Sequence, residues 1–542
     1  MSGASTPSDP VGSASASKSL PPVLSKLMSG TFWLALRTPL QIVFAFVSIP
    51  LVQKYIGDDK NGAYVFAWGF GFLQFLLEFG MSSALQREVS DCWTRGDRVG
   101  VDRAVGCGLN FYLVMALLQA AVLLGIAYLA LPFTRFEGES YDLVVRLLWL
   151  QALTAPCFGL STVVSSILQA ARRYDVLPRF EILIVTARFL ILAAGYAVGL
   201  DFLLVVVLQS VAQVTLSLGP GVWVIVRELG YVPKLRKVKL EDYRSLLRIS
   251  FYLFLIQLSV VLADKVDTSI LGFALDDERV GSAITVYQNV SKAFLQIRQT
   301  GWTLTYLVMP AAASLMAAGD LAGLERVKYD GPRLLVGLLA PAALLAAIYA
   351  GPFLELWVGP RFVGDAPLMR LFLIGVIPLT ISVHVQMAIA MGRVNVIAWS
   401  ALAGSLINLP LSYFLTLRIG VAGVIWGTVV TTLFSNLIVP GIYVFRVLGV
   451  DVRAFLARTL SAPLAGSLAL GIACALMNLA WSAAPPDGAG RFARFLPFLT
   501  HLAVGSLAYA AGYLATPWGR RDLAGVIRRL GRSRGEEAAG VV

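Results

Sequence analysis

Five basic residues lie within long apolar stretches of the sequence, namely Arg37, Arg188, Lys265, Lys292 and Arg298. A charged side chain at the centre of a membrane helix costs at least roughly 2.5–3.5 kcal/mol, so each of these residues needs a partner or a hydrated cavity. Arg and Lys bind phosphate oxygens through charge-assisted hydrogen bonds. We therefore expect some of these cations to bind an anionic ligand, and a diphosphate suits them well.

Arg188 and Lys292 are the strongest candidates because of their depth. At about 1.5 Å per residue, each lies about 15 Å from the start of its predicted helix, residues 178–199 for Arg188 and 281–316 for Lys292. Both positions are near the midplane of a membrane, one in each half of the chain. We predict that they face a shared central cavity, where transporters built from two related halves bind substrate.

The run 281–316 also carries a polar stripe along one helical face, because its polar residues recur at steps of three and four. These residues are Thr285, Gln288, Lys292, Gln296, Gln299 and Thr303. The stripe predicts a face that lines a cavity, and the alternative is hydrogen bonding between helices inside one lobe. Arg298 lies to one side of the stripe and could meet a phosphate as substrate enters.

Other charged residues have weaker interpretations. Arg37 and Glu78 each lie about 10 Å from the same end of adjacent helices, which predicts a structural ion pair or a cytoplasmic gate. Asp264 and Asp267 are candidates to bind a coupling H⁺ or Na⁺, and the alternative is that they neutralise Lys265.

Residues typical of catalysis or metal binding are scattered. The four cysteines have no paired spacing, and His384 and His501 are isolated within apolar runs, which favours packing roles. No Gly-rich phosphate loop and no nucleophile with a nearby base is found. We therefore expect no enzyme activity, no metal site and no cofactor.

The elements that must position these residues are membrane helices, since 57% of the residues are hydrophobic and only 14% are charged. This composition excludes a soluble protein. About fourteen apolar runs are long enough to cross a membrane, which predicts an all-α, polytopic membrane protein. The runs are 30–52, 63–85, 104–132, 143–170, 178–199, 201–226, 249–274, 281–316, 331–352, 366–391, 394–417, 420–445, 455–481 and 495–516.

The basic residues between the runs predict the orientation. Of the 44 Lys and Arg residues, 29 lie in the tails and even-numbered connections and 10 in the odd-numbered connections. Because positive charge stays on the cytoplasmic side, we expect both termini in the cytoplasm of a bacterium and the chain in its inner membrane. Anionic lipids then account for the net charge of +12, and no nucleic-acid partner is expected.

The organisation of the chain follows from a weak internal repeat. Residues 55–64 and 271–287 share a Gly, an acidic pair, a second Gly and a Tyr, and six runs separate them. This spacing predicts two pseudo-symmetric six-helix lobes in the same orientation, followed by a helical pair. The expected parts are a disordered tail (1–29), an N-terminal lobe (30–226), an amphipathic linker (227–248), a C-terminal lobe (249–446), helices 13 and 14 (447–516) and a basic tail (517–542).

An ordered set of motifs between residues 30 and about 450 resembles the multidrug/oligosaccharidyl-lipid/polysaccharide exporter superfamily, specifically its polysaccharide-biosynthesis (Wzx-type) flippase branch. The motifs include Ile56-Gly, Asn61-Gly-Ala-Tyr64, Glu78-Phe-Gly-Met81, Asp267-Thr-Ser-Ile-Leu-Gly272, Glu355-Leu-Trp-Val-Gly359, Gly392-Arg-Val-Asn395 and Gly420-Val-Ala-Gly-Val-Ile-Trp-Gly427. Many relatives have Asp where this chain has Glu78.

The resemblance implies a transporter that moves polyprenyl-pyrophosphate-linked oligosaccharides to the periplasmic leaflet by alternating access of its lobes. The cargo would be an exopolysaccharide, O-antigen or capsule precursor, and a polysaccharide polymerase and chain-length or export proteins would be partners besides membrane lipids. A multidrug cation antiporter and a peptidoglycan-precursor flippase are the alternatives within the superfamily. A membrane polymerase or ligase would need a long periplasmic loop, whereas the predicted external connections are short.

Overall fold

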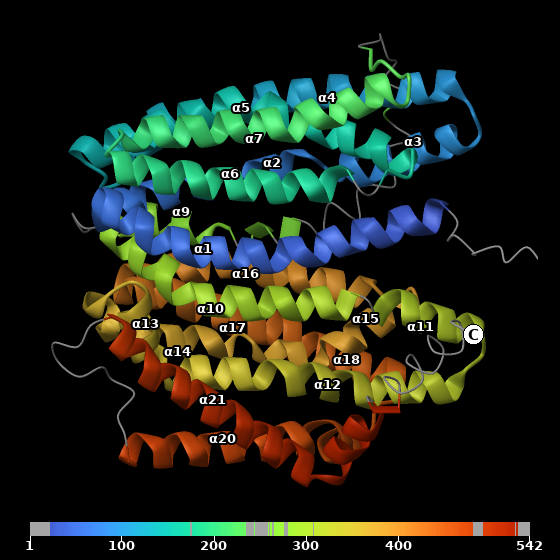
Figure 1. Ribbon diagram of the computed structural model, residues 1–542, viewed down its shortest axis with the longest axis vertical. Coiled ribbons are helices and arrows are strands. Elements are labelled where there is room, and N and C mark those ends of the chain that lie inside the picture. Colours follow the sequence, from blue (N-terminus) through green and yellow to red (C-terminus); the bar gives the residue numbers. More distant parts are fainter. Residues whose placement is uncertain are drawn as a thin grey trace, which may run out of the picture.

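The computed structural model describes residues 22–173, 176–234, 243, 258–259, 261–262, 265–275, 280–306, 308–480, 491–525 and 527–528. These residues form helices and no strands. Eleven helical segments among them are long and apolar enough to cross a membrane. The chain is therefore a multi-pass membrane protein, and its helices run roughly parallel across the view in Figure 1.

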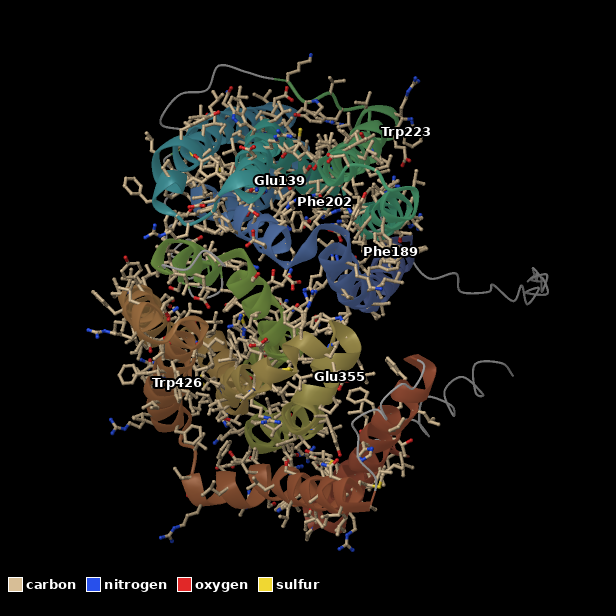
Figure 2. The ribbon with its side chains drawn as sticks, turned by 90° about the vertical axis from the view of Figure 1, so that its left-hand side faces the viewer. Glu139, Phe189, Phe202, Trp223, Glu355 and Trp426 are labelled. Carbon is tan, nitrogen blue, oxygen red and sulfur yellow. The ribbon has the colours of Figure 1, made fainter. Side chains whose placement is uncertain are left out.

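The helix ends gather at two ends of the molecule. The connections that hold Arg95, Arg98, Arg172 and Arg173 define what we call the basic end, on the right in Figure 1. The connections that hold Asp58, Asp59, Glu137 and Glu139 define the acidic end, on the left and facing the viewer in Figure 2, where Glu139 is labelled. The charge pattern predicts that the basic end is cytoplasmic.

The N-terminal lobe contains α1 (Pro22–Gly69), α2 (Phe72–Leu77), α3 (Met81–Thr94), α4 (Arg98–Gly125), η1 (Ile126–Ala130), η2 (Leu131–Phe133), α5 (Gly138–Ala170), α6 (Val176–Val198) and α7 (Phe202–Arg227). α1 is two helices joined at Gly57, whose φ of 79° and ψ of 171° are not helical. Glycine tolerates this positive φ without a steric penalty, so the chain turns back at the acidic end. α1 therefore contains the first expected run and the start of the second, and its start at Pro22 corrects the expected tail of residues 1–29.

The C-terminal lobe contains α9 (Asp267–Ala274), α10 (Val280–Tyr306), α11 (Val308–Ala317), α12 (Leu321–Ile348), α13 (Ala350–Trp357), η3 (Pro360–Asp365), α14 (Ala366–Ile374), η4 (Ile377–Ile381), α15 (Ser382–Ala390), α16 (Asn395–Ile419), α17 (Val421–Leu433), η5 (Phe434–Ile438) and α18 (Val439–Leu448). The appended pair contains α19 (Val452–Ala454), η6 (Phe455–Leu460), α20 (Ser461–Ala480) and α21 (Arg491–Ala515). α20 and α21 pack against each other and against α12 at the lower edge of Figure 1.

The expected count of about fourteen spans stays a prediction. The segment Pro39–Leu77, most of α1 together with α2, is one continuous candidate although the chain turns back at Gly57. α10 is long enough but carries the polar stripe. Much of the expected run 249–274 lies outside the described residues, and so does most of the linker 227–248.

The two lobes meet along α1 and α10, which lie side by side at the centre of Figure 1. Asn61 Nδ2 donates hydrogen bonds to Thr285 Oγ1 at 2.9 Å and to Gln288 Oε1 at 3.0 Å. Thr285 Oγ1 donates to the Asp58 carbonyl at 2.6 Å. We call these four residues the inter-lobe seal. They lie toward the acidic end of α1 and α10.

Further contacts join the lobes in the same half of the molecule. Trp357 Nε1 donates to the Phe46 carbonyl at 2.7 Å, and the Arg361 guanidinium pairs with Asp58 Oδ1 at 2.7 Å. Hydrogen bonds and ring contacts made by α1 between Phe46 and Phe66 join it to the C-terminal lobe. The lobes are therefore joined near the acidic end.

Candidate functional site

A cavity of about 350 Å³ lies where α1, α6 and α7 of the N-terminal lobe face α10 of the other lobe. Its charged lining residues are Arg188 and Lys292, and no carboxylate is found among the lining residues that the structure describes. The remaining polar and aromatic lining side chains are Gln41, Phe44, Ser48, Asn61, Tyr64, Phe189, Phe202, Gln209 and Gln288. Phe189, labelled in Figure 2, lies on the side of the N-terminal lobe toward the C-terminal lobe.

Arg188 is held by two glutamines of α7. Arg188 Nη1 donates to Gln213 Oε1 at 3.1 Å, and Gln209 Nε2 donates to the Arg188 carbonyl at 2.7 Å. Of these two amides, only that of Gln213 contacts the guanidinium, and because it is neutral it does not offset the positive charge. No ion pair of Arg188 is found within the described part of the chain.

Lys292 approaches the same cavity from α10 of the C-terminal lobe. Lys265 is near enough to Lys292 for the two positive charges to interact. No carboxylate partner of Lys292 is found in the ranges the structure covers. A partly buried cation without a counter-ion is costly, so the pair formed by Arg188 and Lys292 favours a hydrated cavity or a bound anion.

The polar stripe of α10 divides between two roles. Thr285 is fully buried in the inter-lobe seal, whereas Gln288 both accepts from Asn61 and lines the cavity. The hydrogen bonds of Thr285 and Gln288 therefore cross between the lobes, whereas Thr303 Oγ1 donates to the Gln299 carbonyl within α10 at 2.9 Å. Gln296 is half-buried and Gln299 is exposed, and neither lines the cavity.

Arg298 also lies outside the cavity lining, which does not favour its expected contact with a diphosphate there. Its guanidinium carbon lies 4.7 Å from the centre of the Phe294 ring and 4.9 Å from that of Trp302. The three residues follow one another at single turns of α10. Cation–π contacts thus hold the Arg298 side chain along its own helix.

The expected ion pair between Arg37 and Glu78 is wrong. Arg37 pairs instead with Glu181, because α1 packs against α6. Glu78, at the end of α2, accepts a hydrogen bond from Tyr112 Oη of α4 at 2.8 Å. Glu181 is not among the residues predicted from the sequence, although an acidic residue within the apolar run 178–199 is itself a signal of a polar contact.

Asp267 occupies a separate polar site in the C-terminal lobe. It is 2% exposed, and its Oδ2 accepts from Tyr287 Oη at 2.6 Å and from Thr428 Oγ1 at 2.9 Å. These hydroxyls come from α10 and α17, so three elements converge on one carboxylate. Asp264, the other expected coupling residue, lies outside the described residues.

The two histidines lie among aromatic rings. His384 contacts the rings of Phe445 and Phe455, and His501 contacts Tyr349 while its Nδ1 lies 2.8 Å from the Pro497 carbonyl. No cluster of three or more metal-ligating side chains is found where the structure describes the chain.

Comparison of the sequence with known proteins identifies relatives of this chain. The sequence model described as "Polysaccharide biosynthesis protein" matches residues 27–296. The uncharacterized membrane protein EpsK of Bacillus subtilis (strain 168) is 29% identical over 190 residues, which cover 32% of this chain and 35% of EpsK. The match thus spans about a third of that relative's length.

Solved structures share the fold at low sequence identity. An inward closed conformation of the lipid II flippase MurJ has a TM-score of 0.69 and 15% identity, with 90% of this chain and 99% of that chain covered. An inward-facing multidrug resistance MATE family transporter of the MOP superfamily has a TM-score of 0.59 and 12% identity, with 78% of this chain and 100% of that chain covered. The chain therefore has the two-lobed fold of these transporters.

Proposed function

Because the chain belongs to the polysaccharide biosynthesis protein family, we propose that it is a flippase for a polyprenyl-diphosphate-linked oligosaccharide. The cargo would be an exopolysaccharide, O-antigen or capsule precursor, carried from the cytoplasmic to the periplasmic leaflet of the inner membrane. The observation that supports this proposal is that Arg188 and Lys292 come from different lobes and line one cavity. A diphosphate supplies the anion that these two cations lack.

The proposed cycle starts with the lobes joined near the acidic end. The lipid-linked substrate enters from the basic end, and its diphosphate contacts Arg188 of one lobe and Lys292 of the other. Since substrate binding then involves both lobes, it can alter the free-energy difference between their two arrangements. Parting of the inter-lobe seal would open the cavity at the acidic end and release the substrate there.

The charge of the cavity argues against the antiporter alternative. A cationic drug would meet Arg188 and Lys292 and no carboxylate among the described lining residues. Like charges at close range repel, so such a drug would bind poorly here. The fold similarity to the lipid II flippase supports a flippase as well.

Coupling to an ion belongs to the same proposal. Asp267 is our candidate to bind H⁺ or Na⁺, because a buried carboxylate among hydroxyls can bind either one. We expect no cofactor and no enzyme activity.

The test is polysaccharide export in cells whose own flippase gene is replaced by variants. Arg188→Ala and Lys292→Ala each remove charge-assisted hydrogen bonds of about 1.5–3 kcal/mol, so we expect export at low substrate levels to fall roughly 10- to 100-fold. The control is Arg418→Ala, since Arg418 is exposed at the end of α16. Normal export by stably expressed Arg188→Ala and Lys292→Ala variants would contradict the proposal.

A further inference from the structure

A second cavity, of about 370 Å³, lies inside the N-terminal lobe between α2, α3, α5, α6 and α7, in the upper, blue-to-green part of Figure 1. It lies toward the basic end, since α5 ends and α6 begins beside it. Hydroxyl and amide side chains dominate its polar lining, and no Lys or Arg is found among its described lining residues. These hydroxyl and amide side chains include Ser82, Gln86, Ser161, Ser165, Gln169 and Ser217. We call this the lobe cavity.

The α5 side of the lobe cavity is a polar stripe within a membrane helix. Ser161, Ser165 and Gln169 recur at four-residue steps and so share one face. Gln169 Nε2 donates to Ser165 Oγ at 2.8 Å and Gln169 Oε1 accepts from Gln86 Nε2, while the Ser161 hydroxyl donates to the Cys157 carbonyl at 2.9 Å. Each hydroxyl and amide can make more hydrogen bonds than these, so the face has unused capacity for a polar ligand.

Aromatic rings and carboxylates complete the lining. Phe158 and Phe180 are half-buried there, and Glu78 and Glu181 also line the cavity. Glu78 accepts from Tyr112 and Glu181 pairs with Arg37, yet a carboxylate can accept about four hydrogen bonds. Ring faces beside hydroxyl, amide and carboxylate groups suit a sugar, which has apolar C–H faces and hydroxyls that both donate and accept.

The lobe cavity lies beside the cavity that holds Arg188. Glu181 lines the lobe cavity and Arg188 lines the first cavity, and both belong to α6. They are seven positions apart, so they share one face of the helix about 10 Å from each other. A diphosphate at Arg188 would therefore leave its attached sugar within reach of the lobe cavity.

We propose that the lobe cavity binds the sugar residues nearest the diphosphate of the lipid-linked oligosaccharide. This inference rests on the proposed function and adds the glycan subsite to it. Arg188 and Lys292 recognise the diphosphate, which every polyprenyl-diphosphate lipid carries, whereas Ser165, Gln169 and their neighbours recognise the sugar.

The experiment compares two probes on the purified protein in nanodiscs. One is a polyprenyl diphosphate without sugar, and the other is the same lipid with one N-acetylhexosamine; native mass spectrometry measures the affinity of each. We expect the unmodified protein to bind the glycosylated lipid roughly tenfold more tightly, as two or so net hydrogen bonds would allow. Gln169→Leu should remove this difference and leave the affinity for the unglycosylated lipid unchanged.

The matched control is Gln151→Leu on the same helix. Gln151 is buried and donates to the Ala67 carbonyl at 2.8 Å, and it does not line the lobe cavity. This control should keep the tenfold difference. Equal affinities of the unmodified protein for both lipids, or equal losses for both in Gln169→Leu, would overturn the sugar subsite.

Arg188→Ala separates this inference from the proposed function. It should weaken the binding of both lipids, because both carry the diphosphate. Unchanged binding of the unglycosylated lipid to Arg188→Ala would refute the diphosphate site, whatever Gln169→Leu does. A lost sugar preference in Gln169→Leu would then still support the lobe cavity.

Discussion

Replacement of Asn61 by Leu should open the cavity at the acidic end. Asn61 is 1% exposed and makes two of the side-chain hydrogen bonds that join the lobes, one to Thr285 and one to Gln288. Leucine has a similar size but cannot donate. The closed arrangement loses both bonds, whereas in an arrangement with the lobes apart water can hydrogen-bond to the same groups.

The free energy lost by the closed arrangement depends on which hydrogen bonds Thr285 and Gln288 keep in the variant. Thr285 keeps its hydrogen bond to the Asp58 carbonyl, and Gln288 also reaches the cavity, so the loss is smaller than for two isolated buried groups. About 1–3 kcal/mol is reasonable for the sum. The equilibrium between the closed and open arrangements should therefore shift about 5- to 150-fold toward opening.

The assay uses Ser48, which lines the cavity. Ser48→Cys is introduced after the four native cysteines are replaced by serine, and a membrane-impermeant maleimide is added outside spheroplasts. Asn61→Leu should raise the labelling rate by a factor in the range above. Asn408→Leu is the matched control, since Asn408 is equally buried but accepts from Ser412 within its own helix. Equal labelling rates with and without Asn61→Leu, in folded protein, would refute the role of the inter-lobe seal.

Three further predictions concern other parts of the structure. Asp522→Asn should lower the free energy of unfolding by about 1.5–3 kcal/mol in thermal denaturation, because Arg333 is 0% exposed and bonds Asp522 at 2.8 and 2.6 Å but keeps Asp330 at 2.9 Å as a second carboxylate; an unchanged melting temperature would count against this ion pair. Asp267→Asn should remove the dependence of transport on an H⁺ or Na⁺ gradient, and transport that still follows the gradient would argue against Asp267 as the coupling residue. Gly281→Val should raise labelling of Ser48→Cys, because a Cβ at Gly281 would collide with the Asp59 backbone; a rate equal to that of the glycine protein would contradict this.

The sequence predicted the charged cavity because burial of charge in a membrane is expensive. Charged residues inside membrane helices are rare and usually functional, so Arg188 and Lys292 were identified as candidates. The structure brings both of them to one cavity. The all-helical class was also predictable, from the high hydrophobicity of the sequence. The depth of each charged residue along its helix was predictable as well.

Lateral packing was not predictable from one sequence. Depth alone allowed either Glu78 or Glu181 to pair with Arg37, and the choice depends on which helix packs against α1. The position of Arg298 along its helix was compatible with ligand binding, but the rings of Phe294 and Trp302, one turn away on either side, hold its side chain. The lobe cavity was not predicted, because Ser and Gln add little free-energy cost to a membrane helix. Their grouping depends on how several helices pack together.

Movement of a lipid-linked sugar between leaflets tests the central claim most directly. The purified protein is reconstituted in vesicles with a radiolabelled polyprenyl-diphosphate sugar in one leaflet, under an imposed H⁺ or Na⁺ gradient. An impermeant enzyme that cleaves the diphosphate then reports which leaflet holds the lipid. We predict rapid movement with the unmodified protein and little with the Arg188→Ala, Lys292→Ala double variant. Movement no faster than in protein-free vesicles, or equal movement by both proteins, would contradict the account.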